Sequence, residues 1–568
     1  MSRKKQDFLR TNLDFFARVD PALSQQLSPA APVRHQVIKT AAGKLNIIRQ
    51  TPDGSGQPIY TSLSPERDAR RSIERIPPAK IEAVIILGTG LGYHLRALGS
   101  RLSPKTMFII LEENEDLFRV ALRHVDFRSL LAPRPWSLLV GNDLHHLIPI
   151  LVNLIETGTQ AFTCCVIPPF DRICGFAPLL SAHIKQAGTI VEFNRRTRGR
   201  LRRRWTSNCV RNLHLLPVSR SLEALAGRFH QVPASIICAG PSLDNQLHQL
   251  PRLLETTLTL CTDSALPVLS KMGLKPHFVI TMDPFAPAAG TGTDPPLSQG
   301  GLICPLTASP ETAESIGPDR YFSRYQDVKL WPAVTSACRS LPRLPVSGSV
   351  SLYAYAVARF LGAKPIIFVG QDLSFPAYKA YSRGTRQADR LLERADRFHS
   401  LERLHLDNVL KRQPVFAKTK EGKHIPTTRT LLQYRLGLHT MCADEPERCI
   451  NCTGGGIMGG NTADLGTTIE PLTGQDQQIA NCWTEIEAEL NESEPAVESE
   501  LLHRALTAIR KDLKNLLESG NSDGKEQTRE LLAPVLAPFG DLIHDTFQTT
   551  KSMPQAIHDT AAFIYNLL

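Results

Sequence analysis

Short apolar runs that stop at glycine, proline or acidic residues recur along the middle of the chain. They lie near residues 235–239, 258–262, 277–282 and 365–369. Runs of this length, bounded by turn residues, predict buried β-strands, and the amphipathic stretches between them predict helices. We therefore expect an open α/β sheet, and the ends of its strands are expected to converge on one crevice.

The N-terminal part has two other patterns. Residues 34–62 alternate apolar and polar side chains between glycine and proline breaks, which predicts a small antiparallel β unit. From residue 81 the pattern changes to a strand at 83–87, a helix that runs to 102 and a second strand at 107–111. This order predicts a βαβ unit.

Three glycines, Gly88, Gly90 and Gly92, follow the first strand of this unit, and Glu112 and Glu113 follow the second. A glycine turn with an acidic residue further on is typical of nucleotide- or adenosyl-binding units. The spacing G-x-G-x-G departs from the G-x-G-x-x-G fingerprint, and a tight turn where a helix packs closely on a sheet explains the glycines equally well. Both interpretations stay open.

The tail differs from the rest because strand signals end after about residue 475. One helical face carries Leu502, Leu506, Ile509, Leu513 and Leu516 and is closed by Gly520. We interpret this stripe as core rather than as a groove for a partner. The chain is thus predicted to divide into a β-containing region (1–75), a Rossmann-like α/β domain with the glycine turn (76–215), a central catalytic α/β domain (216–475) and a helical domain (476–568).

Composition is that of an ordinary soluble protein. Of the 568 residues, 42% are apolar and 21% charged. The first residues lack the apolar stretch of a signal peptide, and no segment holds the roughly 18 apolar residues that span a bilayer, so we expect a cytoplasmic protein. Several of the twelve cysteines lie inside apolar runs, namely Cys164, Cys165, Cys238 and Cys304. Buried thiols are favoured over disulfides, and Cys449 and Cys452 form a C-x-x-C without a second pair for zinc.

The net charge of +10 is partly local. Seven arginines lie within residues 195–204, and Trp205 follows them. Such a run is typical of a nucleic-acid groove, of a patch that gathers an anionic sugar nucleotide or meets an acidic partner, or of a solvated linker helix between domains. We prefer the linker helix, because no further basic and aromatic residues interleave after it.

The most informative turn is at Gly240, where the apolar run 234–238 ends in Gly-Pro-Ser-Leu and a helix is expected to begin. Such a strand-loop-helix hinge places backbone N–H groups where an α/β sheet holds an anionic ligand. Two more runs end in acidic loops, at Asp283 and at Asp372. Asp372 follows Gly370-Gln371, and it either acts as a base or ligand-orienting group or caps the next turn.

Six motifs follow one another between residues 238 and 456. They are Cys-Ala-Gly-Pro-Ser-Leu-Asp at 238–244, Cys-Thr-Asp-Ser-Ala at 261–265, Met-Gly-Leu-Lys-Pro at 272–276 running on to Thr-Met-Asp-Pro at 281–284, Ser-Gly-Ser-Val at 347–350, the segment 361–373 with Gly-Gln-Asp, and Asn-Cys-Thr-Gly-Gly-Gly at 451–456. In this order they resemble the motility accessory factor (Maf) family of flagellin glycosyltransferases. Residues 59–75 and the turn at 88–92 resemble that family's N-terminal region, so the resemblance covers about residues 35–475. The same core also occurs in archaeal-type 6-hydroxymethylpterin diphosphokinases.

The resemblance implies transfer of a nonulosonic acid, of the pseudaminic or legionaminic type, from a CMP-activated donor to Ser or Thr of flagellin, as needed for flagellum assembly and motility. It implies a central domain similar to bacterial sialyltransferases, with the donor phosphate against the N–H groups around Gly240. The residues expected to bind the donor are Gly240, Pro241, Ser242, Leu243, Asp263, Ser264, Gly370, Gln371, Asn451, Thr453 and Gly455. The expected catalytic residues are Asp372, Tyr381 and Asp283. No metal ligand, nucleic acid or membrane span is expected, and the metal requirement stays open.

The chain departs from the family at two informative positions. Tyr381 stands where the family has a histidine, and because a phenol is a weaker base than imidazole at neutral pH, the catalytic base stays open. The phenol would be a comparable base at pH 7 only if the nearby Lys379 or Arg383 lowered its pKa. His277 replaces an aspartate and is interpreted as structural more readily than as a titrating group. The glycine-rich loop 451–460 is expected to cover the donor's base or phosphate, or else to be a lid-like turn.

Two other functions remain open. A pterin-type diphosphokinase would require ATP and Mg²⁺, and it is disfavoured because the additional domains exceed what a small-molecule kinase needs. A non-catalytic flagellin-binding protein would keep the fold and lack the base, as Tyr381 permits.

Overall fold

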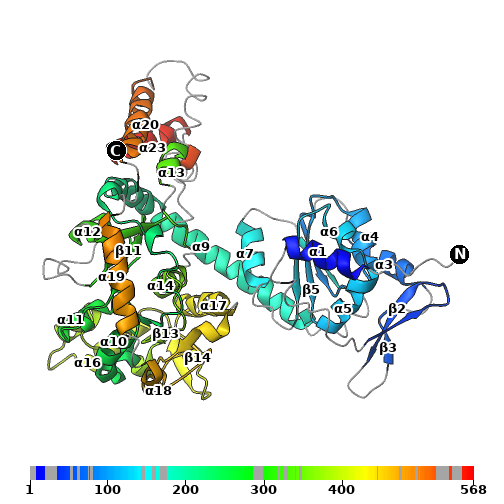
Figure 1. Cartoon of the computed structure of the whole chain (residues 1–568), viewed down its shortest axis with the longest axis horizontal. Coiled ribbons are helices and arrows are strands. Elements are labelled where there is room, and N and C mark those ends of the chain that lie inside the picture. The colour runs from blue at the N-terminus through cyan, green and yellow to red at the C-terminus, as the bar shows by residue number, and fades with distance from the viewer. Residues whose placement is uncertain are drawn as a thin grey trace. The chain divides into compact units, whose positions relative to one another are not determined.

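A computed structural model covers the chain, and many of its helices and strands are labelled in Figure 1. The described residues are 8–19, 23, 35–50, 56–60, 64–74, 76, 81–141, 147–156, 162–166, 176–285, 298–316, 319–324, 331–338, 341–344, 348–443, 445–472, 476–492, 497, 499–519, 537–539 and 553–567. The chain forms two compact units, Met1–Arg196 and Thr197–Leu568. The finer division into four parts remains a prediction.

The first unit begins with helix α1 (Leu9–Val19) and a three-stranded antiparallel sheet. The sheet consists of β1 (Gln36–Lys39), β2 (Leu45–Gln50) and β3 (Gly56–Pro58). The predicted antiparallel β unit is therefore confirmed. Helix α3 (Pro65–Ile73) follows, and Ser64 caps it by accepting a hydrogen bond from Arg67 N.

A four-stranded parallel sheet forms the core of the first unit. Its strands β4 (Ala83–Leu87), β5 (Met107–Glu112), β6 (Trp136–Val140) and β7 (Phe162–Val166) lie in the order β6-β5-β4-β7. The helices between them along the chain are α4 (Tyr93–Arg101), α5 (Glu115–His124), α6 (Phe127–Leu131) and α7 (Leu147–Glu156). The predicted βαβ unit is confirmed as β4-α4-β5, and every residue of β4 is buried.

The arginine run lies on the long helix α9 (Phe176–Leu213), within which one compact unit ends and the next begins. Arg195 and Arg196 both form ion pairs with Glu192, at 2.9 and 2.7 Å. Trp205 is buried, so its ring is not available to stack on a base. These contacts favour the linker helix over the nucleic-acid groove.

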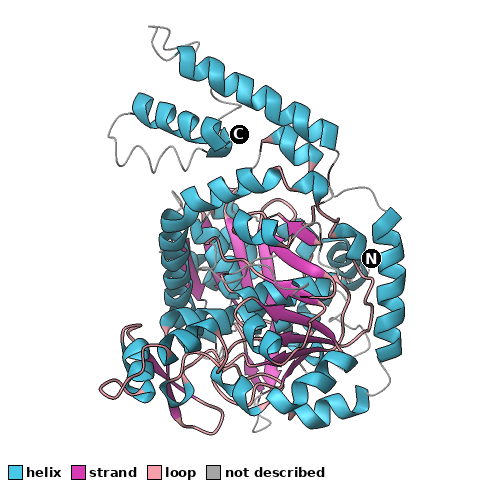
Figure 2. Cartoon of the chain, turned by 90° about the vertical axis from the view of Figure 1, so that its left-hand side faces the viewer, coloured by secondary structure: helices cyan, strands magenta, loops and turns pink. Residues whose placement is uncertain are grey.

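The second unit is built on a seven-stranded parallel sheet with the order β12-β11-β10-β9-β8-β13-β16. Its strands are β8 (Ala234–Ile237), β9 (Leu258–Thr262), β10 (Phe278–Ile280), β11 (Gly301–Pro305), β12 (Arg320–Ser323), β13 (Ile366–Val369) and β16 (Cys449–Asn451). Figure 2 shows strands in magenta among surrounding helices. The four predicted strands are confirmed as β8, β9, β10 and β13, whereas β11, β12 and β16 were not predicted.

Helices and one small hairpin complete the second unit. The helices of the sheet region are α10 (Leu250–Thr256), α11 (Leu266–Lys271), α12 (Pro310–Ser315), α13 (Pro332–Ala337), α14 (Val350–Phe360), α18 (Leu465–Ile469) and α19 (Asp476–Glu492). Between β13 and β16 the chain forms α15 (Arg386–Leu392), α16 (Leu401–Leu410), the antiparallel pair β14 (Val415–Lys418) and β15 (His424–Thr427), and α17 (Arg429–Ala443).

The helical tail is confirmed for the described residues as α20 (Ser499–Ser519) and α23 (Met553–Leu567), which pack on each other, and α20 also packs on α13. Leu502, Leu506, Ile509 and Leu513 are buried in this packing, as predicted for a core stripe. The side chain of Leu516 and residue Gly520 lie outside the described part. Among the described helices, none has the length and apolar character needed to cross a bilayer.

Candidate active site

The candidate site lies where the strand order of the large sheet reverses. β8 pairs with β9 on one side and with β13 on the other. The chain leaves β8 through Gly240 and β13 through Gly370, and Gly240 N–H donates to the carbonyl oxygen of Gly370 at 2.8 Å. In open α/β sheets, ligands bind outside the carboxyl ends of the strands at this switch point. Two predicted loops that are far apart in the sequence therefore meet there.

Asp372 is the buried carboxylate of this site. Its Oδ2 accepts hydrogen bonds from the N–H of Ser242 at 3.1 Å and from the Ser242 hydroxyl at 2.8 Å. Within the described part of the chain, its Oδ1 has no hydrogen-bond partner. Burial raises the pKa of Asp372 to about 6, although both hydrogen bonds from Ser242 lower it. Such a carboxylate is mostly ionised at neutral pH, and one of its buried oxygens lacks a hydrogen-bond donor from the described residues.

Two glycines allow the backbones to approach this carboxylate. A Cβ atom on Gly240 would overlap Oδ2 of Asp372 and the carbonyl oxygen of Gly370. Gly370 has a positive φ of 67°, and a Cβ there would overlap the carbonyl oxygen of Cys238. A side chain at either position would push the two loops apart.

A third loop, Asn451–Gly456, lies against the loop of Asp372. The N–H of Gln371 donates to Thr453 Oγ1 at 3.1 Å, and the N–H of Ile457 donates to the carbonyl oxygen of Asp372 at 2.8 Å. Asn451 holds the loop from within, because its Oδ1 accepts from Thr453 N–H at 3.0 Å. The three loops that carry most of the predicted donor-binding residues are thus in direct contact.

Glycines again decide how close this third loop comes. A Cβ on Gly455 would lie 3.3 Å from the unpartnered Oδ1 of Asp372. Gly456 has a φ of 82°, and a Cβ there would overlap the backbone of Asp372. The backbone of residues 455–456 therefore packs beside Asp372 at a distance that larger residues would not permit.

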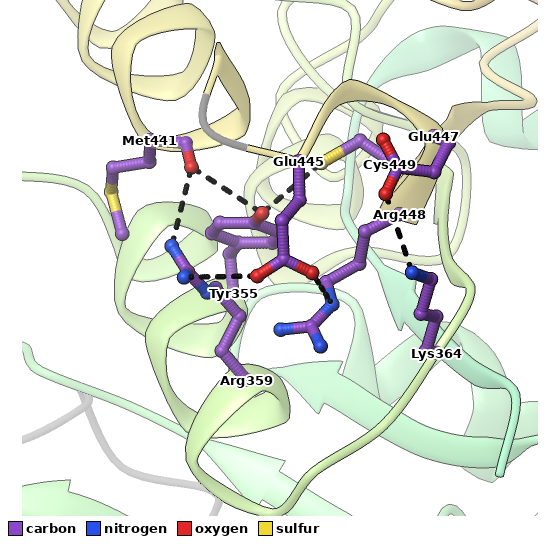
Figure 3. A network of polar contacts seen from close by, with 8 residues as sticks. All are labelled: Tyr355, Arg359, Lys364, Met441, Glu445, Glu447, Arg448 and Cys449. Carbon is purple, nitrogen blue, oxygen red and sulfur yellow. Dashed lines mark hydrogen bonds and ion pairs between the residues drawn. The ribbon is translucent and has the colours of Figure 1, made fainter. Parts of the chain in front are cut away.

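β16, which leads into this loop, is fixed by the polar network of Figure 3. The thiol of Cys449 donates to Tyr355 Oη at 3.2 Å. The Glu445 carboxylate forms ion pairs with two guanidinium groups, those of Arg359 at 3.4 Å and Arg448 at 3.0 Å. Because Tyr355 and Arg359 belong to α14 and Glu445 follows α17, the network ties two helices to the strand.

The two sulfurs of the C-x-x-C contact different elements. Cys452 Sγ lies 3.4 Å from Thr468 Oγ1 on α18, whereas Cys449 points to Tyr355 on α14. Both cysteines are free and buried, as are Cys238 and Cys304, which confirms the prediction of buried thiols at these positions. Cys164 and Cys165 lie in β7, and their side chains are outside the described part.

The turn after Gly240 differs from the prediction, because it continues as a 3-10 helix (η3, Pro241–Asn245) rather than an α-helix. Leu243 N–H donates to the carbonyl oxygen of Gly240, an i to i+3 bond, while Ser242 turns its own N–H and hydroxyl to Asp372. Both donors of Ser242 that were expected to meet a phosphate are thus bound to a carboxylate. Ser242, with Pro241 and Leu243, is buried.

Asp263, Ser264 and Asp283 lie at the ends of the neighbouring strands β9 and β10. Asp263 accepts from Thr281 Oγ1 at 2.5 Å and from the Ser264 hydroxyl at 3.2 Å. Burial raises the pKa of Asp263, and the carboxylate of Asp283 raises it further. Asp283 is exposed, and its Oδ1 accepts from Phe285 N–H at 2.9 Å, so it holds its own loop. Their roles in donor binding and catalysis stay predictions.

Tyr381 lies beside the turn that follows β8. The next residue, Ser382, donates its N–H to the carbonyl oxygen of Ala239 at 2.9 Å and its hydroxyl to Asp244 at 2.6 Å. Arg383, one of the two cations expected to affect the phenol, forms an ion pair with Asp244 at 3.3 Å. The position expected to hold the family's histidine is therefore fixed against the Gly-Pro-Ser turn.

The cation that faces Tyr381 is Arg412, which the sequence did not indicate. Its guanidinium carbon lies 5.7 Å from the Tyr381 ring centroid and 5.8 Å from that of Phe375. Phe375 is three positions after Asp372 and is buried. Two aromatic rings on the rim of the site thus hold one exposed guanidinium, which suits an anionic group of a substrate.

His277 is structural. It is buried ahead of β10, at the end of the sheet opposite Asp283, and its Nδ1 accepts a hydrogen bond from Thr259 N–H at 3.0 Å. Burial lowers the pKa of His277 to about 4, so the ring is neutral at physiological pH. It does not replace an acidic residue at the site.

The glycine turn of the first unit is closed by its own side chains. Glu112 is buried, and its Oε2 accepts from both the N–H and the hydroxyl of Thr89 at 2.7 Å. Tyr60 Oη accepts from Leu91 N–H at 2.9 Å. Because these amides already have protein acceptors, the structure favours the tight-turn interpretation over a bound nucleotide. Gly92 supports it, since a Cβ there would lie 2.9 Å from Val125 Cγ1.

Two further polar residues of the site were missed by sequence reasoning. Gln246 is buried and donates to the carbonyl oxygen of Cys452 at 2.6 Å, which links the turn after Gly240 to the glycine loop. Ser351 at the start of α14 accepts from Gln371 Nε2 at 2.6 Å. Ser351 lies next to the Ser-Gly-Ser-Val motif, but nothing in the sequence indicates that Gln371 is its partner.

Taken together, the fold and site define an α/β protein in which a buried carboxylate and three glycine-containing loops meet at the switch point of a parallel sheet. Open α/β proteins bind their ligands at this place, among them many nucleotide-using enzymes. Residues 59–163 match the family described as Glycosyltransferase Maf N-terminal domain, and residues 207–377 match 6-hydroxymethylpterin diphosphokinase MptE-like. The predicted resemblance to the Maf family is thereby confirmed, and the family match supports a glycosyltransferase role.

Two individual proteins are also similar to the chain. A Treponema pallidum (strain Nichols) protein described as "Uncharacterized protein" is 24% identical over 441 residues, which cover 74% of this chain and 72% of that protein. A solved structure of the MAf glycosyltransferase from Magnetospirillum magneticum AMB-1 is 16% identical, with a TM-score of 0.42, and the match covers 99% of this chain and 90% of that one.

Proposed function

We propose that the protein transfers a nonulosonic acid from a CMP-activated donor to serine or threonine hydroxyls of flagellin, in the cytoplasm before export. The observation that carries the proposal is the unpartnered Oδ1 of Asp372, buried where the Gly240, Gly370 and Asn451 loops meet. The Maf N-terminal match supports the transferase class. The CMP-activated donor and the flagellin acceptor come from the sequence resemblance.

Asp372 is assigned the role of general base. The acceptor hydroxyl would give its proton to Oδ1 while its oxygen bonds to the anomeric carbon, and the bond from that carbon to the phosphate oxygen would break so that CMP leaves. A folded-state pKa of about 6 suits this step, because the carboxylate is mostly ionised at pH 7 and still basic enough to accept a proton. Ser242 positions the carboxylate through Oδ2, and Arg412 is available for an anionic group of the donor.

Thermal unfolding with nucleotides tests the proposal. CMP is expected to raise the melting temperature, because a ligand that binds only the folded state stabilises it, whereas ATP with Mg²⁺ is expected to have no effect. Mass spectrometry of flagellin from cells with and without the protein then identifies the transferred group. Stabilisation by ATP with Mg²⁺ alone would contradict the proposal.

The diphosphokinase remains a second candidate because the MptE-like match covers the Gly240 turn and Asp372. The same titration separates the two functions, since the kinase requires ATP and Mg²⁺. Stabilisation by CMP together with unmodified flagellin would instead favour the non-catalytic flagellin-binding protein, for which the replacement of histidine by Tyr381 is the supporting observation.

A further inference from the structure

The segment between β13 and β16 differs in character from the rest of the second unit. We name residues 376–443 the insertion lobe. It carries 14 Lys and Arg against six Asp and Glu, a net charge of +8 in a chain of net charge +10. The segment that is inserted beside the candidate site is therefore strongly basic, as is the separate arginine run at 195–204.

The lobe also exposes large apolar side chains. Of the twelve that are exposed in the described part of the chain, five lie in the lobe, and their exposed fractions range from 36% to 74%. They are Tyr378, Leu392, Phe398, Leu410 and Phe416. Apolar groups gathered on a surface are typical of a site that another molecule covers, because their burial is favourable by about 25 cal/mol per Å².

Part of this surface adjoins the site. Phe375 N–H donates to the carbonyl oxygen of Pro426 at 2.8 Å, and Thr427 Oγ1 donates to that of Leu373 at 2.7 Å. The hairpin β14-β15 is thus bonded to the loop that follows Asp372. Leu410 and Phe416 flank Arg412 along the chain, and Arg412 lies over the rings of Phe375 and Tyr381.

The outward face of the hairpin combines apolar and basic side chains. On β14, Phe416 and Lys418 are exposed, whereas the alternate residues Val415 and Ala417 are half-buried. The turn that follows adds Lys420 and Lys423 against a single acidic residue, Glu421. A complementary partner therefore needs acidic groups next to apolar ones.

We propose that this face, made of Tyr378, Leu410, Phe416 and the lysines of the hairpin, docks the polypeptide acceptor through an acidic segment with apolar side chains. The inference rests on the proposed function, which requires a protein hydroxyl to reach Asp372. A surface bonded directly to the loop that follows Asp372 would hold the acceptor while the reacting hydroxyl reaches that carboxylate.

Purified flagellin is the probe. The double variant Leu410→Glu with Phe416→Glu is expected to raise both the Kd for flagellin and the KM in the transfer assay by about tenfold or more, with kcat and the CMP-induced rise in melting temperature unchanged. Val218→Glu is the matched control, because Val218 is 60% exposed and lies in the same unit. It stands two residues before Arg220, which is hydrogen-bonded to β12 at the edge of the sheet opposite β16. This control is expected to bind flagellin as the parent does.

A second variant keeps the test independent of the apolar substitutions. Lys418→Gln with Lys420→Gln and Lys423→Gln removes the charges and keeps polar side chains of similar length. Because the lost attraction is electrostatic, this variant is expected to weaken flagellin binding most at low salt. Parent-like Kd and KM in both variants would overturn the docking surface, as would absence of flagellin binding by the parent protein. The lobe variants could instead lose the parent's binding to a single-stranded RNA oligonucleotide and bind flagellin as the parent does. That result would also overturn the docking surface and would assign the face to nucleic acid.

The failure of the proposed function has a different signature. In that case CMP does not stabilise the parent protein and flagellin is not modified, whereas the Kd for flagellin still reports on the docking surface. In the opposite outcome, the parent transfers the sugar to flagellin and the lobe variants have the KM of the parent. That result would support the proposed function and contradict the docking surface.

Discussion

Ser242 gives both its backbone N–H and its hydroxyl to one oxygen of Asp372, at 3.1 and 2.8 Å. The bond joins residues from the ends of β8 and β13, the two strands at the switch point of the sheet. It leaves Oδ1 without a hydrogen-bond partner among the described residues. Under the proposed function, Oδ1 is the oxygen that takes the proton, and Ser242 positions the carboxylate rather than binding the phosphate.

Replacing Asp372 is expected to abolish activity while preserving the fold. Asp372→Asn removes the base, so transfer should fall by about 10²–10⁴-fold. Binding of CMP, measured by thermal shift, should persist. Transfer at the parent rate would show that Asp372 is not the base.

The same variant has a defined pH signature. Because the folded-state pKa of Asp372 is raised from its ordinary 3.8 to about 6, the folded protein holds this proton more tightly than the unfolded chain. The parent therefore loses stability from this group as pH rises through that window, by up to about 3 kcal/mol. Asp372→Asn should be equal to or more stable than the parent at pH 7, with the advantage disappearing near pH 4. Unfolding midpoints measured between pH 4 and 8 check the sign.

Ser242→Ala is expected to act through Asp372. The variant loses the hydrogen bond from the Ser242 hydroxyl and keeps the one from the backbone N–H. Because the hydroxyl lowers the pKa of Asp372, its loss should raise that pKa further. The acidic limb of the pH-rate profile should move to higher pH. Ser315→Ala on the exposed end of α12 is the control and should leave the profile unchanged. A profile of parent shape in Ser242→Ala would remove Ser242 from its positioning role.

Tyr381→Phe and Arg412→Ala separate the rim residues from the base. Tyr381→Phe is expected to transfer close to the parent rate, because Asp372 takes the proton. Arg412→Ala should raise the KM for the CMP-sugar and leave the CMP-induced thermal shift unchanged, since the guanidinium would contact the sugar part of the donor. A loss of about 10²-fold in kcat for Tyr381→Phe would identify the phenol as the base.

Two glycines of the third loop provide a matched pair for stability. Gly456 and Gly460 have nearly the same φ, 82° and 80°, but a Cβ on Gly456 would overlap the backbone of Asp372, whereas nothing lies within 4 Å of a Cβ on Gly460. Gly456→Ala should therefore destabilise the protein by about 1–3 kcal/mol more than Gly460→Ala in urea unfolding. Equal losses would show that the loop is not packed on Asp372.

In the first unit, Thr89→Val should destabilise the fold because it removes a hydroxyl donor from the buried Glu112. The cost of leaving a buried charge less satisfied is about 1–3 kcal/mol. Burial raises the pKa of Glu112, so this group contributes less to the free energy of unfolding as pH rises through the raised pKa. Without the Thr89 hydroxyl, the variant should lose more of this free energy over the same pH range. Denaturation at several pH values checks this, with the exposed Thr467→Val as control. Thermal stabilisation of the first unit by an adenosyl ligand would contradict the tight-turn interpretation.

Sequence reasoning found the strands that alternate clearly with turn residues, such as β8 and β13, because a compact apolar run between breaks has few other solutions. It missed β11 and β12, whose short runs lie in a stretch rich in proline and glycine. It missed β16 because Asn451 belongs both to the strand and to the glycine loop, and the glycines dominate the local pattern.

At the site, the order of motifs was enough to expect the Gly240, Gly370 and Asn451 loops together. The motifs did not predict which residues bond to each other within the site. The bond between Ser242 and Asp372, for example, depends on the register of β8 against β13 and not on local sequence. Arg412 was missed for a similar reason. It belongs to a segment without a motif, and only the packing of α16 and its following turn brings it to Tyr381.

The placement of the lobe between two adjacent strands has an evolutionary consequence. β13 and β16 are hydrogen-bonded neighbours, so the sheet closes whatever length of chain separates them. Residues 382 and 383 of the lobe must keep their bonds to the Gly-Pro-Ser turn, but the remainder of the lobe can change in length between relatives without breaking the pairing of the two strands. If the lobe docks the acceptor as proposed, acceptor choice and donor choice can therefore change separately in evolution.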